Sequence, residues 1–309
     1  MNIGLPQELM HMDCISDLKE MLEQMIPDIT FTHVPSGEAP RYLHLEEDAC
    51  FPFKKMIRNA LALHQDVDVI LLPRVVETDG FLMCPNFRAL PDIVELNTKN
   101  LSSNNKKPIV SPIIELKNDK GLNAIAETIV KELSRISGSK FLTKQAYQKK
   151  GGPDPKNSKT NRPQLSRFIG VIGHPYILTD KRLNNGVPEI LNLYGYETVF
   201  PKDIPFDELN NLAGSLDYFA KKMYWRSARE IIGAFLYFSQ IHPAEGIIHL
   251  APFNCGIDAL LRIELMSLHK TIEDAPPFMT IVCDEHTQRD HVVTRLEAFL
   301  DMIYGIGIN

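Results

Sequence analysis

The sequence lacks the features that mark membrane, secreted and nucleic-acid-binding proteins. Its 309 residues contain no apolar run long enough to span a bilayer. The opening residues, Met1 to Leu5, read as the start of a strand and not as a signal peptide. The formal net charge is −6, which argues against a nucleic-acid groove, because such grooves are basic. We therefore expect a cytoplasmic protein that binds neither membranes nor nucleic acids.

Cysteine is scarce, and its pattern disfavours several common folds. The chain has five cysteines, an odd number spread widely over a large sequence, which is a poor disulfide framework. It contains no Cys-x-x-Cys pair and no ferredoxin-like run, so zinc-ribbon and ferredoxin folds are disfavoured. Cys14 and Cys283 fall in a predicted helix and a predicted buried strand, where cysteine serves as small apolar filler.

The other three cysteines stand beside turn or helix-start residues. Cys50 precedes Phe51-Pro52 and a run with apolar residues at helical spacing, so it should lie at or just before a helix N-terminus. Amides and the positive end of the helix dipole stabilise a thiolate there, and a thiolate is the form that attacks or binds metal. Cys84 precedes a proline and Cys255 a glycine. Lys54 either holds an anion near Cys50 or lies on the helix surface.

Strands and helices alternate along both halves of the chain. Strands are predicted at residues 3–6, 28–34, 67–72 and 108–116, and again at 168–175, 196–201, 246–252 and 278–283. Apolar strands separated by helices imply parallel sheets covered on both faces. We predict an α/β fold of two facing Rossmann-like parallel-sheet domains related by internal duplication. These are residues 1–147 and 166–309, joined by a polar linker at 148–165.

The candidate site lies where the predicted strands end. Ligands of open α/β sheets bind beyond the carboxyl ends of the strands. Cys84 and Cys255 each follow a third strand, and Cys50 precedes the helix that leads into one. If the domains face each other, the three thiolates can meet between them. Such a trio suits zinc, or an iron–sulfur cluster with one iron left open.

Other polar residues follow the strands of the second half. His174 comes after the glycine that ends its first strand, and Asp284, Glu285 and His286 come after its fourth. A carboxylate pair beside an imidazole could relay protons or bind a hydroxyl group, which makes these four residues candidate catalytic groups. Alternatively, Asp284 caps the next element and His286 packs under a loop.

Several motifs occur together and in order, and they resemble those of one known family. The family is that of the activase-related proteins of the 2-hydroxyacyl-CoA dehydratase system, itself related to the dehydratase subunits and to double-cubane-cluster proteins. Its relatives are often fused behind an ATP-hydrolysing activase, and no phosphate-loop signature is found in this sequence. The motifs are Cys50-Phe51-Pro52-Phe53-Lys54, Leu72-Pro73-Arg74 with Cys84-Pro85, Gly173-His174-Pro175-Tyr176, Tyr224-Trp225, Phe253-Asn254-Cys255-Gly256 with Asp258, and Asp284-Glu285-His286-Thr287 followed by Thr294 to Phe299.

The resemblance implies a 4Fe–4S cluster, or a larger one, between two facing domains. Its ligands would be Cys50, Cys84 and Cys255, with Lys54 and Asn254 beside it. The chain would then be an iron–sulfur redox protein that takes low-potential electrons from an ATP-hydrolysing activase. It would use them to reduce or dehydrate a small substrate such as an acyl-CoA, as part of a homo- or hetero-dimer.

Two other hypotheses stay open at this point. The chain could be a non-enzymatic partner that stores or delivers a cluster or electrons. It could also be a metal-free ligand-binding protein whose cysteines are incidental.

Overall fold

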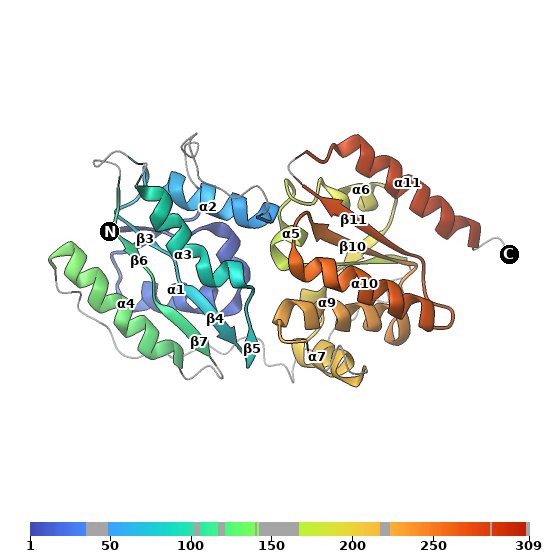
Figure 1. Ribbon diagram of the computed structural model, residues 1–309, viewed down its shortest axis with the longest axis horizontal. Helices are drawn as coiled ribbons and strands as arrows, with labels where there is room; N and C mark the ends of the chain where they lie inside the picture. Colours follow the sequence, from blue (N-terminus) through green and yellow to red (C-terminus); the bar gives the residue numbers. More distant parts are fainter. Residues whose placement is uncertain are drawn as a thin grey trace. The chain divides into compact units, whose positions relative to one another are not determined.

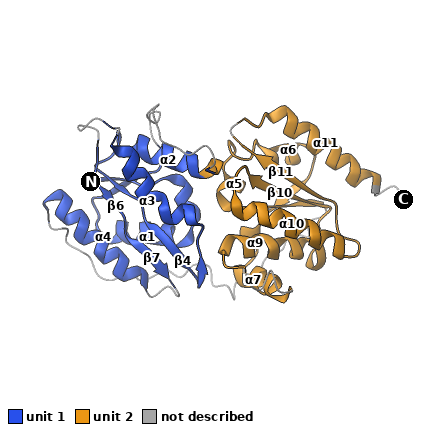
Figure 2. Ribbon diagram, viewed as in Figure 1, with its two compact units in different colours: residues 1–49, 53–152 blue, residues 50–52, 153–309 orange. Residues whose placement is uncertain are grey.

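The chain folds into two compact units. A computed structural model describes residues 1–34, 49–99, 101, 106–116, 121–139, 141, 167–216, 223–284 and 286–306. Residues 1–49 and 53–152 form the first unit, and residues 50–52 and 153–309 form the second (Figure 2). The polar linker predicted at 148–165 lies outside the described residues.

The first unit contains two sheets. The larger has four parallel strands in the order β2-β1-β3-β6, with β1 (Asn2–Gly4), β2 (Thr30–Thr32), β3 (Val69–Leu71) and β6 (Ile109–Val110). The smaller has the order β5-β4-β7, with β4 (Arg74–Thr78), β5 (Phe81–Leu82) and β7 (Ile113–Leu116). Strand β4 pairs in parallel with β7 and antiparallel with β5.

One predicted strand of the first unit is divided. Residues 108–116 were expected to form a single strand, but β6 and β7 belong to different sheets. Ser111 and Pro112 separate them. Proline has no backbone N–H to donate to a ladder, so the strand breaks there and its second part pairs with β4.

The helices of the first unit cover its sheets with apolar faces. They are η1 (Gln7–His11), a 3₁₀ turn, α1 (Asp13–Met25), α2 (Phe51–Leu63), α3 (Pro85–Thr98) and α4 (Leu122–Ser137). Helix α1 packs against α4. The buried residues of α1 recur at helical spacing, as in Ile15, Leu18 and Leu22, so one side of the helix faces the core. Helix α4 ends before Gly138, whose φ of +67° suits glycine.

The second unit is built on one parallel sheet with the order β11-β10-β8-β9. Its strands are β8 (Phe168–Gly173), β9 (Glu197–Val199), β10 (Gly246–Pro252) and β11 (Phe278–Cys283). When the strands of each four-stranded sheet are numbered along the chain within that sheet, both sheets have the same order: second, first, third, fourth. The α/β class and the mostly parallel sheets are confirmed. A facing arrangement and an origin by duplication stay predictions.

Helices cover both faces of the second unit's sheet. They are α5 (Pro175–Thr179), α6 (Val187–Leu193), the 3₁₀ turn η4 (Pro201–Asp203), α7 (Phe206–Ser215), α9 (Arg226–Leu236), the π-helical turn η5 (Tyr237–Ile241), α10 (Gly256–Thr271) and α11 (Arg289–Ile306). Figure 1 shows α6 and α11 on one face, and α9 and α10 on the other. Within the described part of the chain, no helix combines the length and apolarity needed to cross a bilayer.

Candidate functional site

His174 follows the first strand of the second unit directly. Gly173, the last residue of β8, has φ +158°, and a Cβ there would stand 2.7 Å from the carbonyl oxygen of Leu250 in β10. Glycine is needed because that neighbour is backbone and cannot rotate away. His174 then occupies the N-cap of α5, with Pro175 in the first turn, and its side chain is buried. The close approach of β8 and β10 thus fixes the backbone position of His174, from which the imidazole extends.

Cys255 and Asp258 come from the start of α10. After β10 the chain turns through Asn254, whose φ of +59° asparagine tolerates better than most residues. The Cys255 N–H donates to the carbonyl of Pro252 (3.2 Å), and Cys255 becomes the N-cap of α10. Asp258 lies in the first turn, where the helix dipole favours a carboxylate. Both side chains are buried, Cys255 at 7% and Asp258 at 1% exposed.

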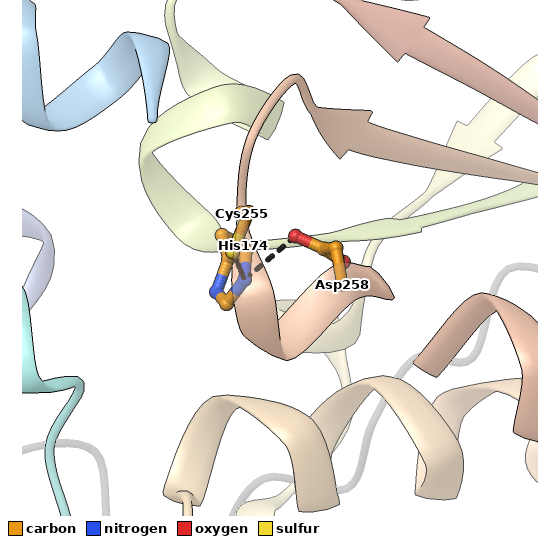
Figure 3. Close-up of side chains that lie close together, drawn as sticks. All are labelled: His174, Cys255 and Asp258. Carbon is orange, nitrogen blue, oxygen red and sulfur yellow. Dashed lines mark hydrogen bonds and ion pairs between the residues drawn. The ribbon is translucent and has the colours of Figure 1, made fainter. Parts of the chain in front are cut away.

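The three side chains form one buried group (Figure 3). His174 Nε2 lies 3.7 Å from Cys255 Sγ with hydrogen-bond geometry, and 2.9 Å from Asp258 Oδ2. Among the described residues no hydrogen-bond donor is aligned with Oδ2, so the contact with His174 is an ion pair. The ligand atoms of the three residues all lie within 4.8 Å of one another. The imidazole also stacks on the Tyr176 ring, with centroids 5.1 Å apart.

A second histidine holds Asp258 from the other side. His249 lies in the middle of β10 and is fully buried, with Nε2 2.9 Å from Asp258 Oδ1. An ionised carboxylate only accepts hydrogen bonds, so His249 Nε2 is the donor. His249 Nδ1 has no partner among the described residues. The contacts therefore run in a line through Cys255, His174, Asp258 and His249.

The charges of His174 and Asp258 support each other. Burial opposes a charge on His174, but the attraction of Asp258 outweighs it and raises the pKa of His174 well above its ordinary value. Burial also opposes the carboxylate, yet the attraction of His174 holds the pKa of Asp258 well below its ordinary value. At neutral pH the pair is an imidazolium beside a carboxylate, and Nε2 of the imidazolium also lies 3.7 Å from the Cys255 sulfur.

Cys50 is linked to this group through a backbone hydrogen bond of the next residue. It immediately precedes α2, which confirms the predicted helix start, and it is buried, with 6% of the residue exposed. Residues 50–52 belong to the second unit, where Phe51 N–H donates to the carbonyl of Phe253 (3.4 Å). That bond joins the residue after Cys50 to the turn that carries Cys255.

Cys84 belongs to the first unit. It is the N-cap of α3, with Pro85 in the first turn, and its side chain is half-buried. All three cysteines of the predicted trio therefore precede helices. Their meeting around one metal centre stays a prediction.

The remaining predicted site residues lie in several places. Asp284 closes a turn after β11, because its Oδ1 accepts from His286 N–H (2.7 Å) and from the Thr287 hydroxyl (3.0 Å). The His286 side chain is exposed, and Glu285 lies outside the described residues. Lys54 is half-buried in the first turn of α2. Of the three candidate catalytic residues that the structure describes, His174, Asp284 and His286, it brings only His174 to Cys255.

The roles of Asp258 and His249 were not predicted from the sequence. Asp258 was singled out only as part of a motif, and His249 not at all. The available signal was His249 itself, the one ionisable residue in the otherwise apolar strand Gly246–Pro252, all of which is buried. A buried polar side chain needs a partner, and the first turn of the next helix supplies a carboxylate.

Residues 2–204, about two thirds of the 309-residue chain, match the model of a known family, the CoA enzyme activase uncharacterised domain (DUF2229). The chain belongs to this family. The matched region includes Cys50, Cys84 and His174, and it ends before Cys255. No curated protein matches the sequence.

Membership confirms the activase-related resemblance and corrects the predicted function. The chain was expected to be the iron–sulfur component that receives electrons from an activase. That expectation is wrong, because the family is described as a domain of the CoA enzyme activase itself. The wider relation to dehydratase subunits and double-cubane-cluster proteins stays a prediction.

Proposed function

We propose that this chain is a component of a CoA enzyme activase and that it prepares a CoA-dependent enzyme of the dehydratase type for turnover. Membership in the activase family is the observation that carries this assignment. In this proposal, another part of the activase hydrolyses ATP. The CoA-dependent enzyme is then the partner, and the acyl-CoA is that partner's substrate.

The chain carries, in this proposal, a 4Fe–4S cluster or a larger iron–sulfur cluster. Cys50, Cys84 and Cys255 would hold it, and it would supply one-electron transfer at low potential. Two features support this: the Phe51–Phe253 hydrogen bond links the backbone beside two of these cysteines, and all three precede helices. Helix N-terminal amides stabilise thiolates and the negative charge of a cluster. The burial of Cys50 and Cys255 would shield it from water.

An activation assay tests the function. The anaerobically reconstituted chain, an ATP-hydrolysing activase protein and a reductant are added to a CoA-dependent dehydratase, and formation of the enoyl-CoA product is followed. We expect the wild-type chain to stimulate product formation and Cys255→Ser to abolish the stimulation. Cys283→Ser is the matched control, since Cys283 ends the strand that pairs with β10 and is also buried. Equal rates with and without the wild-type chain would contradict the proposal.

A mononuclear metal centre is the second candidate. Cys255, His174 and Asp258 offer sulfur, nitrogen and oxygen within 4.8 Å of one another, a donor set that zinc accepts. Metal analysis of the protein as purified separates the two candidates. Zinc that disappears in Asp258→Asn and persists in Cys84→Ser would favour this centre, whereas iron that disappears in Cys84→Ser favours the cluster.

A further inference from the structure

We propose that His174 raises the reduction potential of a cluster bound at Cys255 by donating a hydrogen bond to the cysteine sulfur, and that Asp258 and His249 hold the imidazole in place for it. This role rests on the cluster of the proposed function. It makes His174 a positioning residue and not a metal ligand.

The first support is the position of His174 Nε2 beside the cysteine sulfur. Nε2 lies 3.7 Å from Cys255 Sγ with the geometry of a hydrogen bond to sulfur. A ligand to a second iron would have to stand farther from this sulfur, since each iron–ligand bond is about 2.3 Å long and the irons are themselves separated. The observed spacing suits a donor to a metal-bound thiolate.

The second support is that the donor cannot turn away. The imidazole is 3% exposed, stacks on Tyr176 and lies 2.9 Å from Asp258 Oδ2. Asp258 is held in turn by His249 of strand β10, because His249 Nε2 lies 2.9 Å from Asp258 Oδ1, the other carboxylate oxygen. Two elements, β10 and α10, therefore fix the carboxylate, and the carboxylate fixes the ring.

The expected consequence is electronic. A hydrogen bond to a ligating sulfur draws electron density from it and stabilises the reduced cluster, which carries one more negative charge. The reduction potential then moves to a more positive value. Without the donor, the same cluster is harder to reduce.

Redox titration of the reconstituted protein, followed by electron paramagnetic resonance, tests this role without any activity measurement. His174→Phe replaces the imidazole by an aromatic ring that has no N–H donor, so we expect the protein to retain iron and to have a more negative midpoint potential. His269→Phe is the matched control, because His269 lies in the last turn of α10 and contacts the carbonyl of Pro276. Its midpoint potential should equal that of the wild type.

His249→Gln gives a second, milder test if His174→Phe does not fold. It weakens the support of Asp258 without touching Cys255, and a smaller shift in the same direction is expected. Iron in the wild type with unchanged potentials in both variants would overturn the role of His174 alone. Loss of all iron in a folded His174→Phe would also overturn it, since His174 would then be a ligand. A wild-type protein that binds no iron would overturn the cluster and this inference together.

Discussion

His64 in the first unit and His174 in the second are both buried, and their pKa values are shifted in opposite directions. In the first unit His64 follows the last residue of α2 and accepts a hydrogen bond at Nδ1 from the Lys107 backbone N–H (3.0 Å). Burial, reinforced by Lys106 and Lys107, lowers the pKa of His64 to about 4. In the second unit burial also lowers the pKa of His174, but the effect of the Asp258 carboxylate is larger and raises this pKa above its ordinary value.

The difference shows that burial alone does not make a histidine functional. A buried imidazole loses its charge unless a buried carboxylate restores it. His64 is therefore a neutral acceptor that holds the backbone, whereas His174 keeps its charge beside Asp258. The second unit therefore places a buried, charged histidine beside a buried carboxylate.

The largest expected effect comes from removing the carboxylate. Asp258→Asn leaves His174 and His249 buried without their ion partner, and breaking a buried ion pair in this way costs about 3–5 kcal/mol. Urea denaturation at neutral pH should show this loss. Asp301→Asn, at an exposed position of α11, should stay close to wild type. Similar unfolding free energies for both variants would break the contrast between the units.

The next effect is the pH dependence that His64 produces. Its pKa is lower in the folded state than in the unfolded state, so the unfolded chain binds more protons below pH 6.5. The contribution of His64 to the free energy of unfolding is therefore fully present above pH 6.5. It decreases as the pH drops toward about 4, by about 3 kcal/mol in total. His64→Gln keeps an acceptor for Lys107 and should flatten this part of the curve. A wild-type curve that is already flat between these values would contradict the assignment.

His174 should give the opposite slope. Its pKa is raised in the folded state, so its stabilisation is complete below the unfolded value of 6.5 and is lost as the pH rises through the folded pKa. The difference in unfolding free energy between wild type and His174→Phe should therefore shrink at alkaline pH. A difference that grows with pH would show that the ion pair with Asp258 does not hold the charge.

The glycines that end the first strand of each unit should also differ. A Cβ at Gly173 meets the Leu250 carbonyl oxygen at 2.7 Å, whereas a Cβ at Gly4 meets the Ile70 Cδ1 atom at 2.9 Å. Backbone cannot yield, but the end of an isoleucine side chain can. Gly173→Ala should cost about 1–3 kcal/mol in thermal or urea unfolding, and Gly4→Ala less. Equal costs would mean that β8 and β10 are not held together at this point.

Much of this fold could be predicted from the sequence, because apolar strands ended by proline or glycine are local signals. β10 with Pro252, and the helix start after Cys50, are examples. The division of residues 108–116 between two sheets was not predicted, since it depends on which strand β7 pairs with. The link from His249 to Asp258 was missed for the same reason. It depends on α10 returning over the sheet so that its first turn faces the middle of β10.

The function predicted from the sequence was wrong for a different reason. Cysteines at helix starts indicate metal chemistry but not which side of an electron-transfer reaction the chain serves. Only the family match separates an activase component from the enzyme that it activates.

The iron content of cysteine variants after anaerobic reconstitution tests the central claim most directly. Cys255 and Cys283 are both buried, Cys283 as the last residue of β11 and Cys255 in the turn after β10. Burial raises the pKa of the Cys283 thiol to about 12, and its Sγ–H donates to the Ile281 carbonyl. We predict that Cys255→Ser, Cys50→Ser and Cys84→Ser each lose most of the bound iron, while Cys283→Ser and Cys14→Ser keep it. Equal iron in Cys255→Ser and Cys283→Ser would contradict the claim that the second unit contributes Cys255 to an iron–sulfur cluster.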